Sequence, residues 1–95
     1  MTSKALLFCK DNCGPCQVTK DFLDVLLTEV PALGNYITVM DKDNQAALVD
    51  IYDLDKFPSL LMVDSDGEEM ARLVGGQLVR EDLRGVLFAL RAIDR

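Results

Sequence analysis

Short apolar runs alternate along this chain with segments whose apolar residues recur at helical spacing. The first run, residues 5–9, is continuously apolar, which is typical of a strand buried on both faces. Residues 36–40, 60–63 and 69–74 predict three more strands, the first of these because it is rich in β-branched and aromatic residues. The turn sequence at residues 64–67 joins the last two strands as a hairpin.

Helical spacing predicts three helices, over residues 16–28, 44–52 and 79–93. Pro15 fits the first turn of the first helix, and Pro31 ends it, because the residue before a proline disfavours helix. We expect this helix to present one apolar side, made of Val18, Phe22, Val25 and Leu26. On the last helix the apolar side consists of Leu83, Val86, Leu87 and Leu90.

The order of elements is β-α-β-α-β-β-α, with Asp43 or Asn44 expected to cap the short second helix. A helical crossover makes the first two strands parallel, whereas the hairpin strands are antiparallel. The sequence therefore predicts an α/β fold in which three helices flank a mixed four-stranded sheet. Residues 1–95 form a single domain of this kind, since nothing in the chain repeats or reads as a linker.

Composition narrows the classes of function. The 95 residues are 49% hydrophobic and 27% charged, and ten basic against sixteen acidic residues give a net charge of −6. An acidic chain with no basic run is a poor binder of nucleic acid or anionic membranes. No segment is apolar enough to cross a bilayer or to form a signal-peptide core, so we expect a cytoplasmic protein. Histidine is absent, which excludes histidine-based catalysis.

The candidate chemistry lies in Cys13-Gly14-Pro15-Cys16, between the first strand and the first helix. A thiol attacks only as its thiolate, and the free N–H groups at a helix N-terminus stabilise that anion on Cys13. The two-residue spacer lets Cys16 attack a mixed disulfide formed on Cys13. Pro15 stiffens this turn, and Gly14 leaves room for a substrate backbone. An alternative is half of a zinc site, but Cys9 and carboxylates are the only further ligands, so no metal is expected.

These residues resemble the thioredoxin family over nearly the whole chain. Cys13-Gly14-Pro15-Cys16 has the thioredoxin form, Phe57-Pro58-Ser59 lies where the family carries a cis-proline, and Val74-Gly75-Gly76 lies where it has a glycine after the last strand. The resemblance begins at what is normally the second strand. It implies a cis Pro58 facing the Cys13 sulfur, and a substrate segment that pairs with Phe57 and lies near Gly75.

Three positions depart from the thioredoxin pattern. Asn12 replaces the aromatic residue that usually precedes the first cysteine. Leu7 stands where thioredoxins keep a buried aspartate that assists proton transfer, and Val39 stands near the place of its lysine partner. Hydrophobic residues therefore replace a buried ion pair, and water or a nearby carboxylate, with Asp41 and Asp43 as candidates, must accept the proton of Cys16.

Some features resemble glutaredoxins instead. Lys10-Asp11-Asn12-Cys13 is similar to their Lys-x-Asn-Cys lead-in, in which Lys10 would meet a glutathione carboxylate, although an exposed surface lysine is the simpler interpretation. Gly75-Gly76 before a helix also resembles their glutathione site. Cys9 is either a small buried hydrophobic residue or a third thiol near the site, and we favour the first interpretation.

Three functional hypotheses follow. The first is a dithiol enzyme that reduces disulfide-containing protein substrates and is recycled by a thioredoxin reductase. The second is a glutathione-coupled enzyme, and the third is a binding or accessory subunit that presents the loops around Cys13, Phe57 and Gly75. The first assigns catalysis to Cys13 and Cys16 and substrate binding to Gly14, Pro15, Phe57, Pro58 and Gly75. It needs no cofactor, and we expect a monomer.

Overall fold

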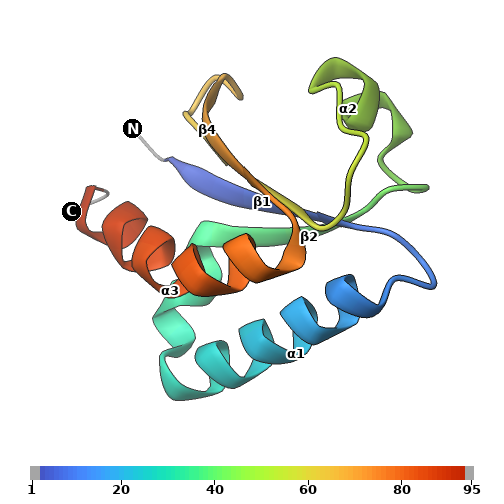
Figure 1. Cartoon of the computed structure of the whole chain (residues 1–95). Helices are drawn as coiled ribbons and strands as arrows, with labels where there is room; N and C mark the ends of the chain where they lie inside the picture. The colour runs from blue at the N-terminus through green and yellow to red at the C-terminus, as the bar shows by residue number, and fades with distance from the viewer. Residues whose placement is uncertain (1–2, 94–95) are drawn as a thin grey trace.

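The computed structural model describes residues 3–93 and shows four strands, three α-helices and one 3₁₀ helix. Helices α1 and α3 lie on one side of the sheet and α2 lies on the other (Figure 1). The elements in chain order are β1 (Lys4–Cys9), α1 (Gly14–Glu29), η1 (Pro31–Tyr36), β2 (Ile37–Asp41), α2 (Ala46–Ile51), β3 (Ser59–Val63), β4 (Glu69–Val74) and α3 (Gly76–Ile93). This confirms the predicted order of elements.

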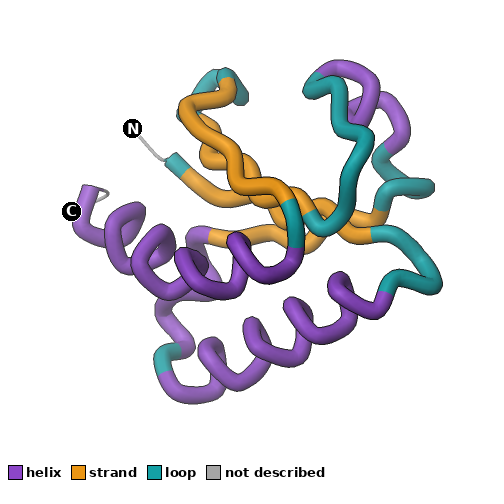
Figure 2. The backbone as a smooth tube through the Cα atoms, in the orientation of Figure 1, coloured by secondary structure: helices purple, strands orange, loops and turns teal. Residues whose placement is uncertain are grey.

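The four strands form one mixed sheet in the order β2-β1-β3-β4 (Figure 2). Strand β1 pairs parallel with β2, so that Leu7 lies opposite Val39, and antiparallel with β3. The β3–β4 hairpin turns at Gly67, whose N–H donates to the Asp64 carbonyl at 3.0 Å. The parallel β1–β2 pair and the antiparallel β3–β4 hairpin confirm the two pairings that the sequence predicts.

Strand β1 is the centre of the core, and its alternate residues serve opposite faces of the sheet. Ala5, Leu7 and Cys9 belong to the larger cluster, which also contains Cys16 and the buried side of α3. The smaller cluster lies on the α2 side of the sheet and consists of Leu6, Phe8, Val49, Leu54, Leu61 and Val63. From Ala5 to Cys9 every residue of β1 is buried, as its continuous apolar run predicts.

The expected apolar side of α1 is buried at Leu26 but not at its other three residues. Val18 is 52% exposed and Val25 is 59% exposed, and Phe22 also faces outward. The residues of α1 that are buried are Cys16, Thr19, Leu23 and Leu26. Cys13 caps this helix and Cys16 is buried beneath its first turn. The position of the cysteine pair therefore determines the buried side of α1, rather than the side with the most apolar residues.

Other boundaries also differ from the prediction. Helix α2 begins at Ala46, and neither Asp43 nor Asn44 caps it with a side chain. Instead, the Asp41 carboxylate accepts the backbone N–H groups of Asp43 and Asn44, at 2.8 and 3.3 Å, in the turn before the helix. Helix α3 begins at Gly76, three residues earlier than expected, and the 3₁₀ helix η1 was not predicted. Val86 is only partly buried, whereas Leu83, Leu87 and Leu90 are buried as expected.

Candidate functional site

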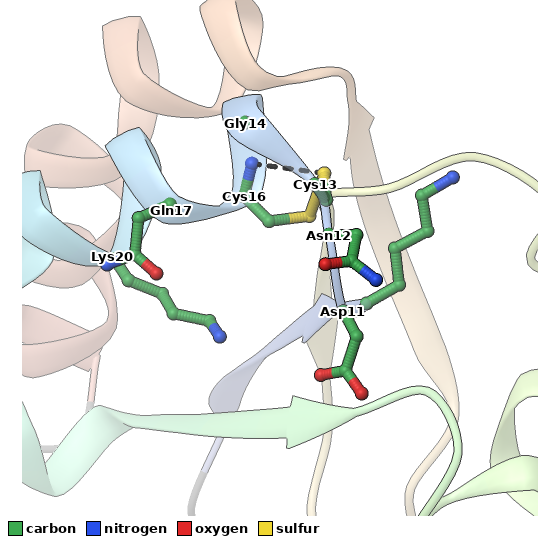
Figure 3. A pocket seen from close by; sticks show the side chains of 8 residues that line it. Asp11, Asn12, Cys13, Gly14, Cys16, Gln17 and Lys20 are labelled. Carbon is green, nitrogen blue, oxygen red and sulfur yellow. Dashed lines mark hydrogen bonds between the residues drawn. A yellow bond between two sulfur atoms is a disulfide. The ribbon is translucent and has the colours of Figure 1, made fainter.

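A disulfide joins Cys13 to Cys16 at the start of α1, with the two Cα atoms 5.2 Å apart. Cys13 is the N-cap residue of the helix, and the Cys16 N–H donates to the Cys13 sulfur at 3.2 Å (Figure 3). A helix N-cap ordinarily offers an oxygen to these N–H groups. Here a sulfur takes that role, so the same hydrogen bond is available to stabilise a thiolate on Cys13.

A short loop between β1 and α1 positions Cys13 at the start of the helix. Strand β1 ends at Cys9, and Asn12 then adopts a left-handed backbone with φ of 53°. Asparagine tolerates this conformation better than most residues, because its short polar side chain bonds locally. Within the first turn of α1, the Thr19 hydroxyl donates to the Pro15 carbonyl at 2.8 Å. The Arg80 guanidinium of α3 in turn donates to that hydroxyl at 3.4 Å, which ties the two helices together beside the site.

The two cysteines differ in burial. Cys16 is 1% exposed and belongs to the larger core cluster, whereas Cys13 is only partly buried. A large substrate can therefore approach Cys13 but not Cys16. Gly14, between them, is exposed, and a Cβ atom there would meet nothing within 4 Å. The order of attack expected from the sequence, with Cys13 first, is consistent with this difference.

The loop before β3 forms a second side of the site. The Phe57–Pro58 peptide bond is cis, as the family resemblance implied. The Cys13 sulfur lies 3.8 Å from the Phe57 carbonyl oxygen. In the disulfide form this is a contact, because a bonded sulfur carries no hydrogen, and the reduced thiol can donate there. Phe57 packs against both core clusters, and the Lys42 ammonium lies 5.6 Å from the centre of its ring.

The junction of β4 and α3 forms a third side. Gly75 has a φ of 98°, a conformation that favours glycine, and its N–H donates to the Pro58 carbonyl at 2.9 Å. A Cβ atom on Gly76 would lie 3.0 Å from the Pro15 Cβ, so α3 begins in close contact with the cysteine turn. The structure thus brings together Cys13, Cys16, Pro15, Phe57, Pro58 and Gly75, segments that are far apart in the sequence.

Beside the disulfide is an open cavity of about 380 Å³. It is lined by Lys10, Asp11, Asn12, Cys13, Gly14, Cys16, Gln17 and Lys20. The Lys20 side chain extends from α1 on the side of the disulfide where Asp11 lies (Figure 3). Both cysteines of the disulfide line this cavity.

The buried ion pair of the thioredoxin pattern is replaced only in part by buried hydrophobic residues. Leu7 is fully buried, but Val39 opposite it is 46% exposed. Cys9 is buried, as expected, and burial raises the pKa of its thiol, while the charge of Lys20 lowers it and that of Asp41 raises it to smaller extents. No carboxylate takes the place of the missing aspartate inside the larger core cluster of the described residues.

Sequence reasoning missed several residues of the site. Thr19 looks like a surface residue, and only its spacing of four from Pro15 indicates a bond to that carbonyl. Asn12 departs from the family pattern, and asparagine before a helix start is itself a signal for a left-handed residue. Lys20 lies one helical turn after Cys16, and this spacing is the signal that places it on the side of α1 bordering the cavity.

Within residues 3–93, no three metal-binding side chains of histidine, cysteine, aspartate or glutamate gather at one place. None of the helices in that range is long and apolar enough to cross a membrane.

Solved structures with the same arrangement include thioredoxins. Fasciola hepatica thioredoxin is 22% identical, with a TM-score of 0.74 over 93% of this chain and 80% of its own. A Schistosoma mansoni thioredoxin pre-protein is 17% identical (TM-score 0.74, 94% and 79%). The germline-specific thioredoxin Deadhead of Drosophila melanogaster is 18% identical (TM-score 0.72, 94% and 81%). No protein-family profile and no curated protein sequence matches this chain. The chain therefore has the thioredoxin fold.

Proposed function

We propose that this protein is a thiol–disulfide oxidoreductase of the thioredoxin type, which reduces disulfides in other proteins. The observation that carries the proposal is the Cys13–Cys16 disulfide at the N-terminus of α1, in which the partly buried Cys13 places its sulfur next to the Phe57 carbonyl. The likeness of the whole fold to thioredoxins is a second observation that supports the proposal. Because the chain has no histidine, it has no histidine-activated nucleophile that could compete with the cysteine pair.

The proposed reaction begins with the reduced pair. The Cys13 thiolate attacks one sulfur of the substrate disulfide, forming a mixed disulfide, and the other substrate sulfur leaves as a thiolate that takes a proton from water. The Cys16 thiolate then attacks the Cys13 sulfur and displaces the second substrate thiolate. Two electrons have passed to the substrate, and the Cys13–Cys16 disulfide remains. A reductase that uses a dithiol and NADPH restores the pair, and we propose a thioredoxin reductase as this partner.

The surrounding loops would hold the substrate during both steps. We propose that an extended substrate segment lies across Phe57, Pro58 and Gly75 and pairs with the backbone there. Gly14 is open enough for such a segment to pass. Pro15 holds the turn rigid between the two cysteines, because its ring fixes φ. Cys16 gives its proton to water, since Leu7 supplies no carboxylate beneath it.

The test is reduction of the insulin disulfides, supplied in parallel with thioredoxin reductase and NADPH or with glutathione, glutathione reductase and NADPH. We expect activity with the first system. Activity with the second alone would support the glutathione-coupled alternative. Failure of the chemically reduced protein to reduce insulin at all would contradict both enzymatic functions and leave a binding subunit.

Three variants assign the roles of the cysteines. Cys16→Ser should trap a mixed disulfide on Cys13, detectable by mass spectrometry, because the resolving thiol is missing. Cys13→Ser should trap none, because the buried Cys16 does not meet the substrate. Cys9→Ala is the matched control and should retain turnover, since Cys9 is buried in the core. Trapping by Cys13→Ser would reverse the assignment of the two thiols.

The glutathione-coupled enzyme remains a second candidate, because one observation favours it. Lys10 lines the cavity next to Cys13, where it would meet a small anionic thiol. The exposure of Lys10 also suits an ordinary surface lysine. The two-reductant assay separates these alternatives without any variant.

A further inference from the structure

The start of α3 lies beside the start of α1 and contacts both halves of the site (Figure 1). On the side of the cis-proline loop, the N–H of Gly75 donates to the Pro58 carbonyl at 2.9 Å. On the side of the cysteine turn, a Cβ atom on Gly76 would lie 3.0 Å from the Pro15 Cβ and 3.5 Å from the Pro15 carbonyl oxygen. The position of this helix start therefore sets the separation between the cysteine turn and the loop that ends at Pro58.

From the second turn of α3, the Arg80 side chain reaches back to the cysteine turn. A Cβ atom on Gly76 would lie 2.7 Å from a guanidinium nitrogen of Arg80, so this nitrogen occupies space that the glycine leaves open. The same nitrogen donates to the hydroxyl of Thr19, which is fully buried and itself donates to the Pro15 carbonyl. A hydroxyl donates one hydrogen, and its oxygen still accepts. Two hydrogen bonds in series therefore connect Arg80 to the turn between the two cysteines.

An ion pair does not explain the position of Arg80. Arg72 pairs with Glu69, and Arg84 lies 3.9 Å from Glu29. Among residues 3–93, Arg80 has no carboxylate within ion-pair distance, although it is half-buried. A buried arginine is ordinarily paired with an acidic residue. The contact that Arg80 makes in place of such a pair is the one with the cysteine turn.

We propose that Arg80 is a positioning residue for disulfide exchange with extended protein substrates. Through Thr19 and Pro15 it holds the cysteine turn at a fixed separation from the loop that ends at Pro58. The inference rests on the proposed function, because it names a residue that serves the same site. A protein substrate must reach Cys13 and lie along that loop at the same time, whereas a small disulfide needs only Cys13. Arg80 should therefore matter for the first kind of substrate and not for the second.

The variant Arg80→Gln tests this with two uncharged substrates, an extended peptide with an internal disulfide and bis(hydroxyethyl) disulfide. Each is mixed with the chemically reduced protein, quenched with acid and analysed by mass spectrometry for the rate of disulfide reduction. Misplacing reacting groups by about 1 Å can slow a reaction about a hundred-fold, and the loss of one hydrogen bond should cost less. We expect the peptide rate to fall about five-fold and the rate with the small disulfide to stay within about two-fold.

The outcomes of this comparison are distinct. Equal losses with both substrates, or no loss with the peptide, would overturn the inference while leaving the proposed function intact. Failure of the wild-type protein to reduce the peptide would contradict the proposed function itself. Arg84→Gln is the matched control, because Arg84 is exposed one helical turn further along α3, and it should leave both rates unchanged.

A double-mutant cycle tests the route from Arg80 to the cysteine turn. Because Arg80 acts through the Thr19 hydroxyl, Arg80→Gln should not lower the peptide rate further in a Thr19→Val background. Thr19→Ser keeps the hydroxyl and should keep the wild-type ratio of the two rates. Independent, additive losses from Arg80→Gln and Thr19→Val would overturn the inference.

A second variant reaches the same place from the other side. Gly76→Ala adds a methyl group that displaces the Arg80 guanidinium and presses on Pro15, so the same selective loss with the peptide is expected. Urea unfolding of each oxidised variant confirms that it is folded before its rates are compared. A folded Gly76→Ala protein with wild-type rates for both substrates would overturn the inference.

The alternative is that the charge of Arg80 acts directly on the Cys13 thiolate. The pH dependence of Cys13 alkylation by iodoacetamide separates the two roles, because a positioning residue does not change how the thiol ionises. We expect the same profile for the wild type and for Arg80→Gln. A profile displaced to higher pH in the variant would overturn the inference and assign Arg80 an electrostatic role.

Discussion

The two faces of the sheet contribute differently to the site. On one face, α1 and α3 cover the larger cluster, which contains Cys16 and Cys9 and holds the cysteine pair in place. On the other face, the short helix α2 and its loops cover Leu6 and Phe8. The second face contributes to the site mainly through the loop that ends at Phe57–Pro58. The comparison teaches that the reactive sulfurs are supported by one half of the core, whereas Phe57 of the proposed substrate platform packs against both halves.

The largest expected effect is a charge placed in the first face by Leu7→Asp. Leu7 is fully buried, and Val39 opposite it offers no positive partner. An unpaired buried carboxylate should lower the free energy of unfolding by several kcal/mol. Burial raises the pKa of such a carboxyl, so the loss should grow as pH rises from about 4. Urea unfolding of the oxidised variant and wild type from pH 4 to 7 measures this, and a loss independent of pH would contradict it.

A matched change in the second face is Phe8→Leu, which should lower the free energy of unfolding by about 1–2 kcal/mol. The ring of Phe8 is fully buried and meets Tyr52 edge-on, with centres 6.3 Å apart. Because this contact lies away from α1, the rate of Cys13 alkylation in the folded reduced protein should not change. A clear change in that rate would mean that the two faces are not separable.

The variant Thr19→Val sharpens the comparison within the first face. It keeps the shape of the side chain but removes the hydroxyl that donates to Pro15 and accepts from Arg80. We expect a loss of about 1–2 kcal/mol in the free energy of unfolding, measured by urea titration. Thr28→Val is the control, because Thr28 makes the equivalent bond to Asp24 on the exposed side of α1. A loss no greater than that of the control would show that the buried bond contributes little.

The smallest expected effect is the pH dependence due to Cys9. Burial raises the pKa of this thiol in the folded protein above its ordinary value of about 8.5. The unfolded chain therefore releases the proton first, and the folded state loses stability as pH rises from about 8 towards the folded pKa. In the oxidised protein the other cysteines do not titrate, so the difference between wild type and Cys9→Ala isolates this effect. Parallel stability curves from pH 7 to 10 would contradict it.

The sequence predicts the sheet well and the faces of the helices unevenly. None of the charged residues of α3 is buried, so the charge pattern identifies the buried side that contains Leu83 and Leu87. In α1, the inner residues Cys16 and Thr19 look less apolar than the outward-facing Val25, and local periodicity selects the wrong side. The phase of that helix is set by a tertiary requirement, which a single sequence does not display.

Some parts of the candidate site can also be predicted from the sequence, and others cannot. The cysteine turn follows from local chemistry, because a thiol pair at a helix start is meaningful by itself. The approach of Phe57 and Gly75 was implied by family resemblance, since no pattern in either segment points to the other. The cavity lined by Lys10 and Lys20 could not be foreseen, because it depends on the left-handed turn at Asn12.

The hydrogen bond from the Gly75 amide to the Pro58 carbonyl provides a natural reporter of the substrate platform. An amide proton exchanges with solvent only when its hydrogen bond opens. Deuterium uptake at Gly75 therefore records how often the Phe57–Pro58 loop separates from the start of α3. One backbone signal, followed by nuclear magnetic resonance in the oxidised and reduced protein, would reveal whether the redox state of the sulfurs loosens the surface on which a substrate lies.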